Sequence, residues 1–234
     1  MNMKTAILLI TFSVGTVFGL SAATVSETFN SGFANGGNIP DGNPNPWSDT
    51  RSLSGITDGS ILSLSVRLDI SGGYNGDLYS YLSYNGVLVP LLNRVGVGSG
   101  NAFGYNDSGL RVTFTDSGPS NIHFYQASLG YDISSGAGQW RPDGRMINPL
   151  TSAPAAFDAP GTTTFASFNG MNPNGDWTLV VADTSSGGGQ AQLMSWGLDI
   201  TTVVPEPTSL ALAALGALLL LARAIRAKRF RQST

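Results

Sequence analysis

The stretch Leu62-Ser63-Leu64-Ser65-Val66-Arg67-Leu68-Asp69-Ile70 alternates apolar and polar side chains at every position. Successive side chains of a β-strand point to opposite faces, so a period of two is typical of a strand with one buried face. We expect the buried face to carry the five apolar residues Leu62, Leu64, Val66, Leu68 and Ile70. The stretch therefore predicts a sheet that packs on an apolar core.

The segment that follows predicts a β-hairpin. Residues 79–84 and 87–92 are rich in Tyr, Leu and Val, and they flank Asn85-Gly86. This dipeptide favours the positive φ angles of a type I′ turn. Pro90 has no amide hydrogen to donate, which places the second strand at a sheet edge or at a bulge.

Five further segments have the composition of short strands: 111–115, 122–125, 163–168, 177–182 and 194–201. We expect Trp177 and Trp196, in the last two segments, to lie in the core. Segments 30–47 and 134–160 are rich in Gly, Asn and Pro and read as loops. No long helical period occurs before Leu210. The pattern predicts an all-β domain, either a β-sandwich or a jelly roll.

The N-terminus reads as an export signal. Residues 1–23 contain one charge, Lys4, then an apolar run over 6–20, and they end in small residues. This order predicts a signal peptide cleaved between Ala23 and Thr24. The alternative, a buried N-terminal helix, would need a partner face and fits the small-residue end poorly.

The C-terminus carries a second signal. Every residue over 210–222 is Leu, Ala or Gly, and a basic tail follows with Arg223, Arg226, Lys228, Arg229 and Arg231. We expect a transmembrane helix at about 209–225, near the lower end of the roughly 20 residues that a bilayer requires. The basic tail would then remain in the cytoplasm.

The segment between these signals is acidic. Residues 24–204 hold six arginines, no lysine and 14 acidic residues, a formal net charge of −8. Such acidity argues against nucleic acid as a partner. It is compatible with calcium, although no D-x-[DN]-x-[DN]-G spacing is present.

The sequence offers few catalytic groups. It has no cysteine, so thiol chemistry is excluded, and its one histidine is His123. A Ser-His-Asp triad or a common zinc site would depend on that residue. We expect His123 to be an ordinary strand residue, and no spacing of Asp residues singles out a glycosidase pair.

The tail resembles the PEP-CTERM family of bacterial sorting signals, in which a Pro-Glu-Pro motif, a hydrophobic helix and an Arg-rich tail follow one another. Pro205, Glu206 and Pro207 carry the match. The resemblance implies a Gram-negative-type envelope and an exosortase, a membrane peptidase, as partner. A plain C-terminal anchor with an incidental motif is the alternative.

Two blocks resemble the P domain (P/Homo B) of kexin- and furin-like proprotein convertases. The first runs from Tyr74-Asn75-Gly76-Asp77-Leu78 to Leu91-Leu92-Asn93-Arg94. The second is Gly175-Asp176-Trp177-Thr178-Leu179-Val180-Val181-Ala182-Asp183-Thr184, followed by Leu193-Met194-Ser195-Trp196-Gly197-Leu198. The resemblance implies a jelly-roll β-sandwich related to galactose-binding-like folds. In the convertases this domain follows a subtilisin-type protease, for which the exported segment here is too short.

Four segments summarise the expected organisation: a signal peptide at 1–23, a Gly/Asn/Pro-rich segment at 24–53, a P-domain-like β-sandwich at 54–202 and the sorting signal at 203–234. The leading hypothesis is an exported, non-enzymatic protein, sorted to the cell envelope or extracellular polymer, with a structural or adhesive role. The alternative is a polysaccharide-binding module, with or without calcium, in which loop residues Trp47 and Trp140 stack on sugar. A hydrolase that uses acidic residues is a third hypothesis.

Overall fold

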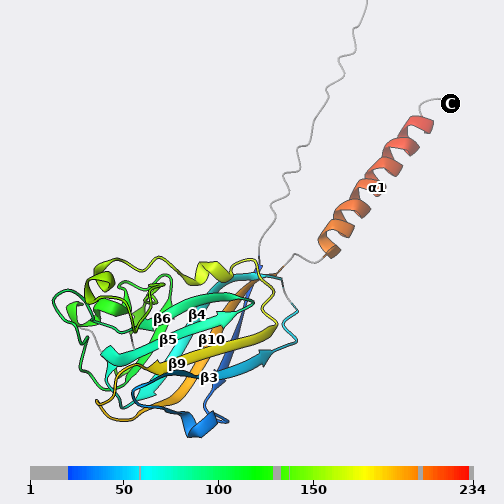
Figure 1. Cartoon of the computed structure of the whole chain (residues 1–234). Helices are drawn as coiled ribbons and strands as arrows, with labels where there is room; N and C mark the ends of the chain where they lie inside the picture. The colour runs from blue at the N-terminus through cyan, green and yellow to red at the C-terminus, as the bar shows by residue number, and fades with distance from the viewer. Residues whose placement is uncertain (1–20, 58, 129–132, 137, 205–207, 232–234) are drawn as a thin grey trace, which may run out of the picture. The chain divides into compact units, whose positions relative to one another are not determined.

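The strands of the computed structural model form two sheets that pack face to face (Figure 1). The structure describes residues 21–57, 59–128, 133–136, 138–204 and 208–231. Residues Ala22–Val204 form one compact unit, and the C-terminal helix belongs to another. The expected all-β sandwich is confirmed.

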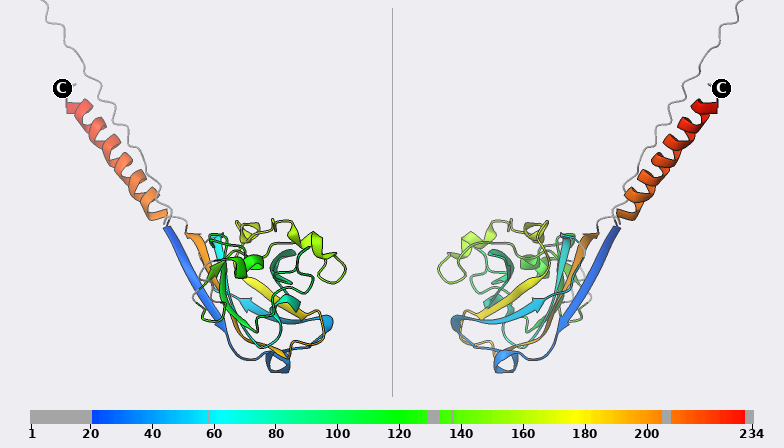
Figure 2. Two further views of the ribbon diagram at one scale, coloured as in Figure 1. Left: turned by 90° about the vertical axis from the view of Figure 1, so that its left-hand side faces the viewer. Right: turned by 90° about the vertical axis from the view of Figure 1, so that its right-hand side faces the viewer.

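The first sheet has the strand order β1-β10-β4-β7-β8, with β2 also paired to β10. Its strands are β1 (Ser21–Phe29), β2 (Asn38–Ile39), β4 (Ile61–Ser71), β7 (Leu110–Thr115), β8 (Gln139–Trp140) and β10 (Ala191–Val204). β10 and β4 pair in antiparallel register, with Trp196 opposite Leu68 and Ile200 opposite Leu64. Figure 2 shows β1 and the end of β10 side by side along one edge of this sheet.

The second sheet has the order β3-β9-β5-β6. Its strands are β3 (Asn43–Leu53), β5 (Leu78–Tyr84), β6 (Val87–Asn93) and β9 (Gly175–Asp183). The predicted hairpin is confirmed, since Asn85 and Gly86 both have positive φ angles, 48° and 78°. Pro90 lies on the edge strand β6, next to a register shift opposite Ser80 and Tyr81. Its missing amide hydrogen is tolerated at such a place.

The connectivity is that of a jelly roll. Apart from the two-residue strands β2 and β8, the chain has eight strands. In sheet order, the first sheet contains β1, β10, β4 and β7, and the second contains β3, β9, β5 and β6. Consecutive long strands therefore alternate between the two layers, except at the β5–β6 hairpin, where both strands lie in the second sheet. After the hairpin, β7, β9 and β10 alternate again and pair beside the earlier strands. Each layer presents one apolar face to the other, which is why one-sided alternation appears in the sequence.

Aromatic side chains fill the space between the layers. Trp177 is fully buried and stacks on Tyr84, with ring centroids 4.0 Å apart. Trp196 packs on Phe29 and donates its indole hydrogen to Asp49 at 2.7 Å. Both tryptophans are therefore core residues, as the sequence predicts.

Two apolar residues are exposed although the alternation of apolar and polar residues along their strands places them on the buried face. Leu62 is 49% exposed and Met194 is 46% exposed. Each coincides with a register shift in the β10–β4 ladder, one between Thr201 and Thr202 and the other between Leu193 and Ser195. A bulge inserts one unpaired residue and reverses the facing of the side chains beyond it. The expected inward face of the strand therefore begins at Ile61 and Leu64, and Leu62 is not part of it.

The segments 122–125 and 163–168, predicted as strands, form short 3-10 helices instead. The 3-10 helices are η1 (Ala34–Gly37), η2 (Asn75–Asp77), η3 (Ile122–Ala127), η4 (Pro154–Asp158) and η5 (Phe165–Phe168). The Asn121 side chain accepts a hydrogen bond from the His123 amide and begins η3. The Asp116 carboxylate accepts from the Phe165 and Ala166 amides at 2.9 and 2.8 Å and begins η5 from 49 residues away.

The sandwich also begins earlier than expected. The sequence predicts a separate Gly/Asn/Pro-rich segment at 24–53, but these residues contribute most of β1 and all of β2 to the first sheet, and β3 to the second. β3 contains two prolines and little alternation, so its pattern does not indicate a strand. Pairing with β9, from Trp47 opposite Val181 to Leu53 opposite Gly175, determines its structure.

The C-terminal helix α1 spans Thr208–Arg231. This confirms that a helix follows the Pro-Glu-Pro sequence, which itself lies outside the described residues. The expected transmembrane span at about 209–225 is not confirmed: within the part of the chain that the structure describes, no helix is long and apolar enough to cross a membrane.

Candidate functional site

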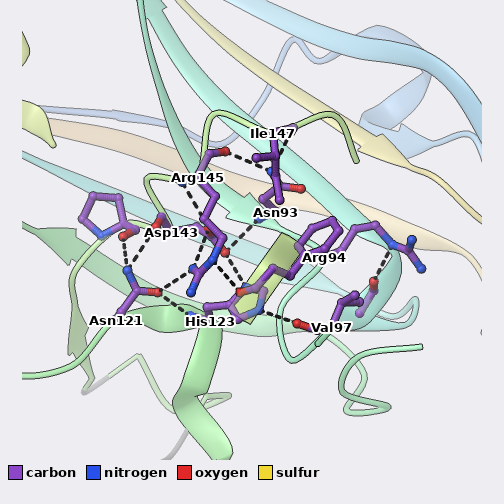
Figure 3. A network of polar contacts seen from close by, with 11 residues as sticks. Asn93, Arg94, Val97, Asn121, His123, Asp143, Arg145 and Ile147 are labelled. Atoms are coloured by element: carbon purple, nitrogen blue, oxygen red, sulfur yellow. Dashed lines mark hydrogen bonds and ion pairs between the residues drawn. The ribbon is translucent and has the colours of Figure 1, made fainter. Parts of the chain in front are cut away.

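A buried network of polar side chains surrounds Asp143 (Figure 3). Its carboxylate lies 2.7 Å from His123 Nδ1 through one oxygen and 3.0 Å from Arg145 Nη1 through the other. All three side chains are almost completely buried, with exposed fractions of 3% or less. A charge that is buried in this way is stable only when it is paired and hydrogen-bonded.

Neighbouring groups complete this Asp143 network. His123 Nε2 lies 2.8 Å from the Val97 carbonyl oxygen. A carbonyl oxygen only accepts, so Nε2 is the donor and the ring has no free nitrogen. The Asn93 amide group donates to the carbonyl oxygens of Arg145 and Ile147, both at 3.0 Å. The network thus attaches the loop after β8 to β6 and to η3.

This arrangement gives His123 a structural role. The ring is buried in η3 rather than exposed on a strand, and both nitrogens are engaged. A general base must reach the proton that it abstracts, which this ring does not. Breaking such a buried pair typically costs about 3–5 kcal/mol, so the network holds the loop in place.

The structure corrects the expected sugar platforms. Trp47 lies in β3 with 7% of its surface exposed, and its Nε1 donates to the Ala34 carbonyl at 3.0 Å. Trp140 lies in β8 with 5% exposed and packs edge-on against Tyr125. A stacking platform requires an open ring face, and neither tryptophan has one. Both rings belong to the hydrophobic core, which the sequence does not reveal.

A cleft lies instead on the outer face of the second sheet. Its volume is about 380 Å³, within the usual range for ligand pockets. It is lined by Pro46, Tyr79, Tyr81, Leu88, Ala182, Thr184 and residues 146–150. Tyr79 and Tyr81 are two residues apart on β5 and so share its outer face, with ring centroids 5.6 Å apart. We call this the tyrosine cleft.

The cleft combines apolar walls with a few polar atoms. Met146 and Leu150 on the loop are 63% and 52% exposed. Burial raises the pKa of Tyr79, and the nearby Tyr81 and Asp143 raise it further, so its phenol remains a neutral hydrogen-bond donor. Because the Asp143 network anchors the loop that starts at Arg145, it also positions one wall of the cleft.

A second group of acids gathers at one end of the same sheet. Asp183 ends β9 and is completely buried, and Asp77 precedes β5. Burial raises the pKa of Asp77, with Asp41 adding to the effect and Ser185 and Arg94 opposing it. Within the described residues, no group of three or more His, Cys, Asp or Glu side chains is placed to hold a metal ion.

The predicted signal-peptide cleavage site lies in a strand of the first sheet. Ala23 and Thr24 are part of β1, where the Thr24 hydroxyl is 3.1 Å from the Thr201 hydroxyl of β10. Pro205, Glu206 and Pro207 lie outside the described residues. β10 ends at Val204, directly before them.

Sequence reasoning did not identify the tyrosine cleft or the Asp143 network. The run Trp140-Arg141-Pro142-Asp143-Gly144-Arg145 was a usable signal for the network, because it places opposite charges in a chain with few charged residues. The cleft has no comparable signal. Tyr79 and Tyr81 are visible on the outer face of a predicted strand, but the loop that faces them joins the site only through tertiary contacts.

Comparison with known families identifies the C-terminal segment. Residues 203–229 match the PEP-CTERM protein-sorting motif. The motif supports export of the chain to the cell envelope of a Gram-negative bacterium and processing by an exosortase-type membrane enzyme. No curated protein matches the chain.

Two solved structures have some similarity to the sandwich. One is the serine protease of Aeromonas sobria in complex with the chaperone ORF2, at 15% identity and a TM-score of 0.43. The other is the same protease alone, at 15% identity and a TM-score of 0.42. Each comparison covers 78% of this chain and 27% of the protease chain. The chain thus spans about a quarter of the length of these proteins.

Proposed function

We propose that this chain is an exported, non-enzymatic β-sandwich protein that an exosortase-type system sorts to the cell envelope or extracellular polymer, where it has a structural or adhesive role. The sorting motif carries this proposal, because it begins where the last strand of a compact domain ends. The fully engaged His123 supports the non-enzymatic part.

The proposed cargo is a P-domain-like module. The two sequence blocks that resemble P domains form β5, β6, β9 and residues 193–198 of β10. Three of these strands make up most of the second sheet.

The placement of the two expected cuts supports processing of a folded domain. Cleavage between Ala23 and Thr24 removes only the first residues of β1, and the bonds from Thr24 to Thr201 and from Ser26 to Asp199 remain. Cleavage within the Pro-Glu-Pro sequence leaves β10 complete. Both cuts therefore preserve the sandwich.

Mass spectrometry of the protein recovered from its native envelope tests the sorting proposal. The mature chain should start at Thr24 and lack the basic tail. Deletion of Pro205, Glu206 and Pro207 should leave the tail attached and keep the protein in the membrane fraction. A matched control, Asn85-Gly86 replaced by Asp-Gly, keeps the turn type and should be processed normally. Unchanged processing after the deletion would contradict the proposal.

The second candidate function is polysaccharide binding, now assigned to the tyrosine cleft. Adjacent tyrosine rings offer apolar faces together with hydroxyl groups, which suits a ligand that has both C–H and O–H groups. The volume of about 380 Å³ and the exposed Met146 and Leu150 favour this location over Trp47 and Trp140.

Retention of the protein on the polysaccharide of its own host tests this function. Tyr81→Ala should weaken retention about tenfold or more, since it removes one ring of the pair. Phe103→Ala is the matched control, because Phe103 is 75% exposed and does not line the cleft. Equal retention of both variants, or no retention of the parent protein, would remove polysaccharide binding and leave the sorting proposal intact.

A further inference from the structure

Two aspartates from distant parts of the sequence meet at one end of the second sheet. Asp183 is the last residue of β9 and lies opposite Asn43 of β3 and Leu78 of β5. Asp77 directly precedes Leu78. The Thr184 amide and hydroxyl both donate to the Asp77 carbonyl oxygen, at 2.9 and 2.8 Å. These bonds fix the end of β9 against the start of β5.

The Asp183 carboxylate is only partly satisfied. Asp183 is completely buried, and it shares the inward face of β9 with Trp177, Leu179 and Val181. Its Oδ1 accepts a long hydrogen bond of 3.4 Å from the Ser185 amide. Its Oδ2 is buried and has no hydrogen-bond partner. A buried oxygen of this kind is costly to leave unpaired, so it points to a ligand.

The charges around it are mostly negative. Asp41 lies in the adjoining loop and accepts from the Gly187 amide at 3.1 Å, and Asp77 bonds to the Ser185 side chain. Arg94 lies beside Asp77, but its Nη2 is 3.9 Å from Asp77 Oδ1 and beyond hydrogen-bond range. Three carboxylates and one guanidinium leave a surplus of two negative charges when all are ionised.

The Asp183 carboxyl group therefore lies among like charges and lacks a close positive partner. A bound cation would supply one.

We propose that Asp183 and Asp77 bind one hard divalent cation of the calcium type, with Asp41 contributing to charge balance. The ligand atoms that these side chains offer are all oxygens. Calcium prefers oxygen ligands, whereas transition metals are usually bound through nitrogen or sulfur. Calcium takes six to eight oxygens, so main-chain carbonyl groups and water must complete the shell around two carboxylates. The three acids are not placed to hold a metal ion by themselves, so the remaining ligands must come from the main chain and from water.

The location suits a weak extracellular calcium site. The cation would link β9 and β5 to the loop before β3, which are far apart in the sequence. Sites of this kind bind in the range of about 0.1–1 mM, and they stabilise the fold by binding only the native state. The site is independent of whether the tyrosine cleft binds polysaccharide.

Thermal unfolding of the full-length protein in mild detergent, after treatment with EDTA, tests the proposal with calcium chloride alone as the probe. At pH 7.5, 10 mM calcium should raise Tm by about 3–6 °C, and the same concentration of magnesium should have a smaller effect. Calorimetric titration should give one ion per chain. If calcium neither shifts Tm nor gives heat in the titration, the proposal is overturned, and a proton rather than a cation neutralises the buried Asp183 carboxylate.

Two variants localise the effect. Asp183→Asn should abolish the calcium shift and still fold, because it removes a buried charge and retains the shape of the side chain. Asp176→Asn, on the exposed start of the same strand, should keep the full shift. A calcium response that persists in Asp183→Asn would place the ion elsewhere and refute this site.

Discussion

Asp143 and Asp183 are both completely buried, but their surroundings are opposite. Asp143 has a partner for each carboxylate oxygen, His123 at 2.7 Å and Arg145 at 3.0 Å. Asp183 accepts only from main-chain amides, those of Ser185 and Gly42, and it has one oxygen without a hydrogen-bond partner and other carboxylates nearby. Equal burial therefore gives a stabilising group in one case and a destabilising group in the other.

The difference shows what a buried carboxylate requires. Removal from water costs several kcal/mol in both places, and only close opposite charges or donors offset it. Around Asp143 the fold supplies them, and the result is a fixed loop that forms one wall of the tyrosine cleft. Around Asp183 the fold supplies too few, which is why we propose an external cation there.

The largest expected effect is that of Asp143→Asn. The change keeps the shape of the side chain but leaves Arg145 buried without its counter-charge, so the free energy of unfolding should fall by about 3–5 kcal/mol. Urea denaturation followed by tryptophan fluorescence measures it. A loss below about 1 kcal/mol would mean that the network is no stronger than a surface pair.

The same change from Asp to Asn at position 183 should shift the free energy of unfolding in the opposite direction. Without calcium at pH 7.5, Asp183→Asn should raise the free energy of unfolding by about 1–3 kcal/mol, because it removes an unpaired buried charge. Urea denaturation in EDTA, next to the parent protein, provides the measurement. Destabilisation would indicate that Asp183 has a partner that the contacts do not reveal.

The pH dependence of the metal-free protein should follow Asp183. Its folded pKa, about 6, lies above the usual 3.8, so the folded state retains the proton more strongly than the unfolded state. The stabilisation is fully present below about pH 4 and is lost as pH rises to about 6. It amounts to about 1–3 kcal/mol, where the lower figure allows for solvent screening. Denaturation midpoints from pH 4 to 7 measure it, and Asp183→Asn should lack this component.

The smallest effect is expected at an exposed pair. Arg111 Nε lies 3.1 Å from Asp69, and the Arg111 side chain is 61% exposed. Asp69→Asn should change the free energy of unfolding by less than about 1 kcal/mol, since water and salt screen such pairs. The same denaturation assay calibrates the two buried sites. If Asp69→Asn changed the free energy of unfolding as much as Asp143→Asn, burial could not explain why the two ion pairs differ in strength.

The sequence predicted those parts of the fold whose signals are local. The alternation over 62–70, the Asn85-Gly86 turn and the strands around Trp177 and Trp196 all occur within about three residues of their expected positions. The prediction was wrong where a distant group decides the structure. Asp116 caps η5, pairing with β9 makes β3 a strand, and bulges turn Leu62 and Met194 outward.

The candidate sites depend on tertiary structure to a greater degree. Trp47 and Trp140 were expected on the surface because their neighbours are loop-forming residues, but both rings belong to the hydrophobic core. The Asp143 network joins residues 20 positions apart, and Asp41 reaches Gly187 across 146 positions. Contacts at such separations leave no periodic pattern in the chain.

The sequence by itself determined the class of the domain and its destination. Side-chain periodicity defines a one-sided strand, and the C-terminal sorting motif is recognised as a linear signal, so neither depends on the fold. Only the tertiary structure decided which buried aspartate is paired and which is not. The energy of a buried charge depends on the few atoms within about 4 Å of it, and folding alone brings those atoms together.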